Sequence, residues 1–202
     1  DAGEPERIVS AVGRLNLSYA VITSVTRDDL EDGGATQFAH CIRRIREVHP
    51  TCTVEVLIPD FQGSLPALRT VMAAAPAVIN HNMEVSETLF PELRPEGSYK
   101  RSLELLQRVC EQAPDIVTKS GFMIGLGEEH DDLIRLMADL RTAGCRRLTI
   151  GQYLQPTRNH WPVQKYYHPD EFADLRQEAL EMGFDSVMAG PLVRSSYHAA
   201  GM

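Results

Sequence analysis

The segment FAHCIRRIREVHPTCTVEVLI, residues 38–58, contains one complete helix-to-strand unit. Its first half places apolar residues at the three- and four-residue spacing of an amphipathic helix. These residues are Phe38, Cys41, Ile42, Ile45 and Val48. Pro50 ends the helix, and residues 53–58 have the short, β-branched apolar pattern of a buried strand. The segment therefore indicates a β/α protein if the same alternation recurs.

The alternation recurs along the whole chain. Further strands are expected at residues 19–25, 77–80, 116–123, 146–151 and 184–189, and further helices at residues 5–15, 65–75, 98–112, 128–141 and 169–182. Successive βα units form parallel sheets, closed into a barrel or open and doubly wound. Because no Gly-x-Gly-x-x-Gly follows the first strand, the pattern favours a partial parallel (β/α) barrel over a dinucleotide-binding sheet. We expect one domain over residues 1–202, with residues 184–202 as a C-terminal extension.

Composition excludes several classes of protein. The 202 residues carry a net charge of -8 without a cluster of Lys and Arg, which argues against nucleic-acid binding. No stretch reaches the roughly 18 apolar residues that span a bilayer, and the acidic start is unlike a signal peptide. We therefore expect a protein of the cytoplasm or an organelle matrix. The four cysteines have no metal-ligand spacing and are expected to be core residues.

Polar residues collect at the carboxyl end of each of the first five expected strands, in residues 23–34, 59–63, 80–84, 118–121 and 151–156. The carboxyl ends of parallel strands face a common mouth, so one concave polar site is expected there. Lys119 is expected at the end of a buried strand, where it must reach a polar mouth or pair with an acid, for which Glu84 is a candidate. Simpler interpretations exist for other groups. Asp32 fits a helix cap, His81 fits a turn, and residues 125–128 fit a tight strand-to-helix turn.

Several of these segments together resemble one family, lipoyl synthase. The similar strings are VITSV at 21–25, RDDL at 27–30, DGGA at 32–35, PDFQG at 59–63, NHNME at 80–84, TKSG at 118–121, GLGE at 125–128, IGQYLQP at 150–156 and GPLVRSSYH at 190–198. They cover nearly the whole chain in the order of the family. The resemblance implies a radical S-adenosylmethionine enzyme with a partial barrel, two 4Fe–4S clusters and S-adenosylmethionine. Its reaction inserts two sulfur atoms at C6 and C8 of a protein-bound octanoyl-lysine.

The resemblance also implies roles for individual residues. Thr23 and Ser24 would contact the methionine part of S-adenosylmethionine. The ribose, amino and carboxylate groups of S-adenosylmethionine would be contacted by Asn80, Glu84, Lys119 and Gln152. In the tail, Ser196, or else Ser195, would bind an iron of the auxiliary cluster, while Arg194 and Tyr197 would contact the substrate. No catalytic residue is assigned.

The main departure from the family is that the cysteine motifs that bind both clusters precede the first helix and are absent here. We expect the barrel to lack its first strand, and this chain alone to bind no intact cluster and to be inactive. The implied partners are an octanoylated lipoyl-carrier protein or domain and an electron donor such as ferredoxin or flavodoxin.

Three alternatives remain open from the residues. Another sulfur-inserting radical enzyme, similar to biotin synthase, shares the fold but would not need the serine-bearing tail. An aldolase-like barrel would use Lys119 as a Schiff-base nucleophile. A non-catalytic module could bind a carrier domain through its acidic surface, although the tail favours an enzyme.

Overall fold

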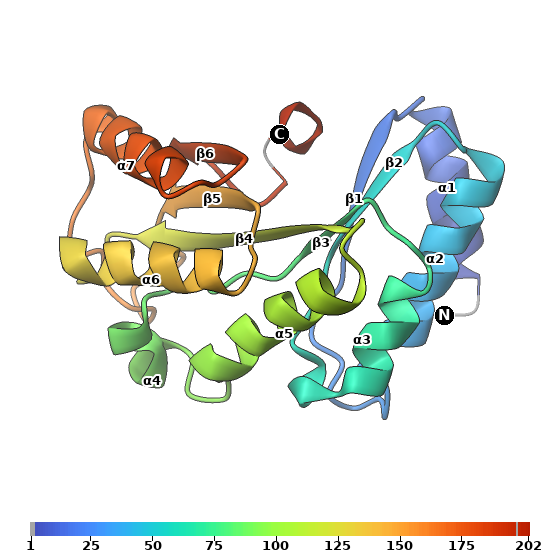
Figure 1. Cartoon of the computed structure of the whole chain (residues 1–202), viewed down its shortest axis with the longest axis horizontal. Coiled ribbons are helices and arrows are strands. Elements are labelled where there is room, and N and C mark those ends of the chain that lie inside the picture. The colour runs from blue at the N-terminus through green and yellow to red at the C-terminus, as the bar shows by residue number, and fades with distance from the viewer. Residues whose placement is uncertain (1–2, 197) are drawn as a thin grey trace. The chain divides into compact units, whose positions relative to one another are not determined.

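The computed structural model describes residues 3–196 and 198–202, and within them parallel strands alternate with helices (Figure 1). The strands are β1 (Tyr19–Thr23), β2 (Thr53–Leu57), β3 (Val78–Asn80), β4 (Val117–Ile124), β5 (Arg147–Gln152) and β6 (Ser186–Gly190). The helices are α1 (Glu4–Arg14), α2 (Ala35–Val48), α3 (Leu65–Met72), α4 (Phe90–Leu93), α5 (Tyr99–Gln112), α6 (His130–Thr142) and α7 (Pro169–Glu181). Short 3-10 turns lie at Phe61–Gly63, Glu87–Leu89 and Ala199–Gly201. The predicted α/β class with parallel strands is therefore confirmed.

The chain divides into two compact units, which are described separately. Unit 1 comprises the residues up to His81 together with Arg108–Val117, and unit 2 comprises Asn82–Gln107 and Thr118–Met202.

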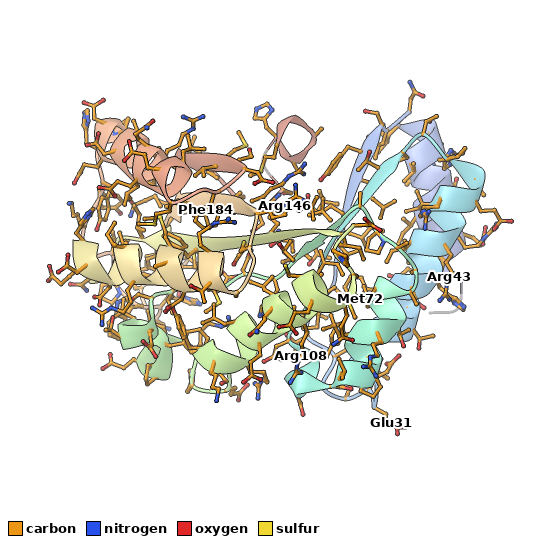
Figure 2. All side chains as sticks on the ribbon, viewed as in Figure 1. Glu31, Arg43, Met72, Arg108, Arg146 and Phe184 are labelled. Atoms are coloured by element: carbon orange, nitrogen blue, oxygen red, sulfur yellow. The ribbon has the colours of Figure 1, made fainter. Side chains whose placement is uncertain are left out.

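Unit 1 contains the parallel strands β1, β2 and β3, with β2 paired to both of the others. Helix α2 packs against α1, α3 and β2, as the blue to cyan part of Figure 1 shows. Its fully buried Ile42 and Ile45 come from the helical stripe predicted by the sequence. Arg108, labelled in Figure 2, donates a 3.2 Å hydrogen bond to the carbonyl of Gly63.

Unit 2 contains the parallel strands β4, β5 and β6, with α7 packed against β6. The expected helix signals are present. The Ser98 hydroxyl accepts a 3.3 Å hydrogen bond from the amide of Arg101 at the start of α5, and Gly144 has a positive φ of 82° just after α6. Glu129 and Asp132 form a reciprocal capping box that begins α6.

Several details of the structure differ from the sequence prediction. In α5 the buried stripe runs through Ser102, Leu105, Leu106 and Val109, so Cys110 is exposed and not a core residue. Cys110 faces outward because Leu105 and Leu106 both face inward, at the i+3 and i+4 positions from Ser102. The short α4 was not predicted, since four residues are too few to show a helical period.

Phe184 was expected to begin the last strand, but β6 starts two residues later. The Phe184 side chain, labelled in Figure 2, is instead buried beneath the guanidinium of Arg141, 5.2 Å from its ring centre. Among the helices of the described residues, none is long and apolar enough to cross a bilayer.

Candidate functional site

In unit 1, the residues that follow β1 line a cavity of about 240 Å³. Thr23 and Ser24 are both exposed there, beside Arg27 and Gln37. Asp32 lies outside the lining and caps α2, because its carboxylate accepts hydrogen bonds from the amides of Gly34 (2.9 Å) and Thr36 (2.8 Å). The hydrogen bonds from Thr36 and Gly34 lower the pKa of Asp32, although its partial burial opposes them. The cavity therefore offers hydroxyls to a ligand, beside an Arg27 guanidinium that already donates to both carboxylate oxygens of Asp29 (2.7 and 2.6 Å). Asp32 acts as the helix cap that its sequence position favours.

The PDFQG segment after β2 is an unusual turn. Phe61, Gln62 and Gly63 have φ values of 48°, 51° and 82°, in the left-handed region that most side chains avoid. Asp60 stabilises the turn by accepting a 2.9 Å hydrogen bond from the amide of Gln62. The Phe61 ring lies so close to Gly33 that a Cβ there would be 2.8 Å from its Cδ1. Because Gly33 has no side chain, the DGGA and PDFQG segments can pack against each other.

At the end of β3, Asn80 belongs to a buried polar cluster that the sequence prediction missed. Its amide donates a 3.3 Å hydrogen bond to Glu55, which also accepts a 2.6 Å hydrogen bond from the Tyr19 hydroxyl. Glu55 and Asn80 are completely buried, and Asn80 Oδ1 has no hydrogen-bond partner among the described residues. The one sequence signal was an acid inside the apolar strand TVEVL. His81 bonds the carbonyl of Ile58 through Nδ1 at 2.9 Å, as expected for a turn residue.

In unit 2, four residues from distant segments lie together. The amide of Asn82 donates to Glu84 Oε1 at 3.0 Å and to Ser195 Oγ at 2.7 Å. Lys119 on β4 is fully buried and its ammonium donates to the carbonyl of Ser195 at 2.8 Å. Asn82 was not assigned a role from the sequence, although it stands inside the NHNME string.

Glu84 has a backbone conformation that most residues avoid, with φ of 68°. Its amide donates to Gly121 O at 3.1 Å and its carbonyl accepts from Met123 N at 2.8 Å, which joins this loop to β4. Left-handed backbone in a residue with a side chain often marks a functional position. These bonds place the Glu84 carboxylate at a cavity of about 120 Å³.

That cavity is bounded by the ends of β4 and β5 and by the tail. Its lining includes Asn82, Glu84, Thr149, Arg194 and Ser195. The buried Asn82 Oδ1 has no partner among the described residues, so the cavity has an unused acceptor. Gly121 keeps the wall open, because a Cβ there would collide with the Thr149 hydroxyl.

Gln152, at the end of β5, holds the long loop that follows. Its amide nitrogen donates to the carbonyls of Ile124 (3.2 Å), Tyr153 (3.1 Å) and Lys165 (3.0 Å). Its oxygen accepts from the amide of Tyr167 at 3.0 Å. The Gln152 side chain thus already has protein partners for its donors and its acceptor.

The tail residues are placed differently from one another. Ser195 is half-buried, whereas Arg194 and Ser196 are exposed. Arg194 donates to the carbonyl of Val193 at 2.7 Å. Tyr197, which the resemblance assigns to the substrate, lies outside the described residues.

The cysteines do not form a cluster site. Cys41, Cys52 and Cys145 are buried and Cys110 is exposed, and burial raises the pKa of Cys145 to about 12. Metal ligation needs the thiolate, which such a pKa disfavours. In the described part of the chain, no group of three or more His, Cys, Asp or Glu side chains could hold a metal ion.

Comparison with solved structures defines the class of fold. A domain of a pyruvate-formate lyase-activating enzyme from Bacteroides vulgatus matches with a TM-score of 0.60 and 8% identity, covering 84% of this chain and 98% of that one. Methylornithine synthase matches with a TM-score of 0.66 and 13% identity, covering 95% of this chain and 63% of that one. The chain therefore shares the parallel α/β fold of these two enzymes.

Comparison with curated sequences narrows the class to one family. The chain is 54% identical to lipoyl synthase of Rubrobacter xylanophilus over 199 residues, covering 98% of this chain and 62% of that protein. It is 51% identical over 200 residues to lipoyl synthase of Alkaliphilus metalliredigens, covering 99% of this chain and 69% of that protein. No family model matches. The chain belongs to the lipoyl synthase family, and it spans about two thirds of the length of these relatives.

Proposed function

We propose that the protein containing this chain is a lipoyl synthase, which inserts sulfur at C6 and C8 of an octanoyl group on a carrier-protein lysine. The observation that carries the proposal is 51% to 54% identity to proteins of that name across nearly the whole chain. An octanoylated lipoyl-carrier protein is the proposed substrate, and ferredoxin or flavodoxin the proposed electron donor.

The polar residues of each unit fit S-adenosylmethionine. In unit 1, Thr23 and Ser24 offer hydroxyls beside the Arg27 guanidinium, which suits an amino-acid carboxylate. In unit 2, Glu84 and the unused Asn82 Oδ1 suit hydroxyl or ammonium donors. When bound, S-adenosylmethionine would supply the carbon radical that removes hydrogen from the octanoyl chain. The proposed contacts in unit 1 are Thr23, Ser24 and Asn80, and those in unit 2 are Glu84, Lys119 and Gln152.

The chain's own contribution is to bind, orient and exclude water. A primary carbon radical reacts with most C–H bonds, so both reactants must be held in fixed positions away from water. Lys119 and Gln152 contribute to this rigidity, because each joins a strand to a later segment of the chain.

The described residues do not fit an iron–sulfur cluster, since the cysteines are separated and mostly buried. No step through a cluster is therefore derived from them. The two 4Fe–4S clusters, and the assignment of Ser196 or Ser195 as an iron ligand, rest on the family resemblance.

Genetic complementation tests the proposed function. The complete protein should restore lipoate-independent growth to a bacterium that lacks lipoyl synthase. Glu84→Gln should reduce this rescue at least tenfold, because a charged acceptor at the cavity is lost. Glu87→Gln, which changes an exposed acid three residues away, is the matched control and should rescue fully. Failure of the unchanged protein to rescue growth would contradict the proposal.

A further inference from the structure

The segment after β6 is packed into unit 2 and is not a loose tail. Val193 is 7% exposed, and its amide donates to Gly190 O at 3.1 Å. Its carbonyl lies so close to Gly151 on β5 that a Cβ at that position would collide with it. The tail therefore needs a glycine on the strand beneath it, which indicates a specific docked position.

Ser195 is fixed at two of its atoms. Its hydroxyl accepts the 2.7 Å hydrogen bond from Asn82, and its carbonyl accepts the 2.8 Å hydrogen bond from the Lys119 ammonium. The second bond is charge-assisted and comes from a fully buried group, which makes it costly to break. Two bonds to separate atoms fix both the position and the orientation of this residue.

The donor on Asn82 is itself oriented by its neighbours. One amide hydrogen is directed to Glu84 at 3.0 Å and the other to Ser195. The guanidinium of Arg94 donates to the carbonyls of Asn82 and Met83, both at 3.3 Å, and so holds the loop backbone. A donor fixed in this way contributes more to docking than one that must first be ordered.

The docked tail forms one wall of the 120 Å³ cavity, through Val193, Arg194 and Ser195. Asn82 also belongs to that lining, so one amide contacts both the tail and the proposed ligand space. By linkage, a ligand that binds better when the tail is docked must also stabilise the docked tail.

We infer that Asn82 and Lys119 are positioning residues that anchor the tail at Ser195, and that this anchor sets the shape of the cavity. Ser195 thus serves as the anchor. The neighbouring Ser196 is exposed and is the serine that can make other contacts. The docking itself does not depend on the proposed function. Its effect on S-adenosylmethionine binding rests on that function.

Hydrogen–deuterium exchange of the tail, measured by mass spectrometry on peptides covering residues 190–199, tests the anchor without any ligand. Ser195→Ala should speed exchange of these amides about tenfold, the effect expected for losing a well-oriented hydrogen bond. Ser195→Thr keeps the hydroxyl and should restore slow exchange. Ser196→Ala is the matched control and should leave exchange unchanged.

Lys119→Met should also speed exchange in the tail. If this variant does not fold, the results for the Ser195 variants alone test the anchor. Unchanged exchange in Ser195→Ala, or equal exchange in the Ala and Thr variants, would overturn the anchor.

A second measurement uses S-adenosylmethionine as the probe, with the complete protein. Addition of the probe should slow tail exchange, and Ser195→Ala should weaken its binding about tenfold while Ser195→Thr binds normally. In one outcome, the ligand-free exchange results agree with the prediction, and S-adenosylmethionine binds but leaves tail exchange unchanged. That outcome would support the anchor and refute its coupling to S-adenosylmethionine binding. If the probe does not bind the unchanged protein, the proposed function fails instead.

Discussion

The phenol of Tyr167 donates a 3.0 Å hydrogen bond to Glu128, across 39 residues of sequence. The two carboxylate oxygens of Glu128 also accept from the amides of Gly125 (2.7 Å) and Leu126 (2.9 Å). Gly125 and Gly127 have φ values of 99° and 114°, so the turn needs glycine at both positions. Burial and the neighbouring Glu128 carboxylate raise the pKa of Tyr167, which keeps this donor protonated.

Glu128→Gln should therefore destabilise the fold by about 1–3 kcal/mol, because the new amide cannot accept at both positions and leaves a buried N–H unpaired. Urea unfolding checks this value. Tyr167→Phe should cost about 1 kcal/mol, and the double variant should cost less than the sum because the two residues share a bond. Strictly additive costs would show that the bond contributes nothing.

Gln152→Ala should release the loop between β5 and α7, because the side chain bonds residues at both ends of it. Trypsin should then cleave after Arg158 and Lys165 about tenfold faster, as local opening becomes easier. Gln177→Ala is the control, since this exposed glutamine donates a 2.9 Å hydrogen bond to Glu181 on the same helix. Equal rates of cleavage in the two variants would contradict the role of Gln152 in holding this loop.

Gly121→Ala should destabilise the protein by about 1–3 kcal/mol, because its Cβ would collide with the Thr149 hydroxyl. Thermal unfolding measures the loss. Combining it with Thr149→Ala should recover part of the stability, since that change removes the nearest colliding atom. Gly201→Ala is the control, because nothing lies within 4 Å of a Cβ there. If the second substitution brings no recovery, the collision is not the cause.

The cysteines should react very unequally with a thiol reagent at pH 8. Exposed Cys110 should be modified first, and Cys145 last, because burial raises its pKa to about 12 and keeps the folded thiol protonated. Anaerobic reconstitution of this chain with iron and sulfide should accordingly yield far less than one cluster per chain. Stoichiometric iron and sulfide would contradict this description of the cysteines.

The periodic parts of the fold were predictable from sequence. The helical stripe from Phe38 to Ile45 and the strand after it stand where their spacing predicted, since burial of an apolar face determines both. The exposure of Cys110 on α5 was not predicted. Adjacent Leu105 and Leu106 leave two possible stripes, and only tertiary packing chooses between them.

The polar sites were only partly predictable. The NHNME string could be selected because it lies at a strand end, whereas the TKSG string, which was also placed at a strand end, lies inside β4. The sequence does not show that Lys119 and Asn82 both bond Ser195. Such contacts join segments far apart in the chain and carry no periodic signal. Glu55 was missed for a related reason, because a single acid within a strand usually faces solvent.

The most direct test of the proposed function is the conversion of an octanoylated lipoyl-carrier domain by the complete, anaerobically reconstituted protein. With S-adenosylmethionine and a reductant present, mass spectrometry should show the octanoyl-lysine converted to lipoyl-lysine, and much less product with Glu84→Gln. A carrier that stays octanoylated, although the reconstituted protein is folded and binds S-adenosylmethionine, would contradict the assignment to lipoyl synthesis.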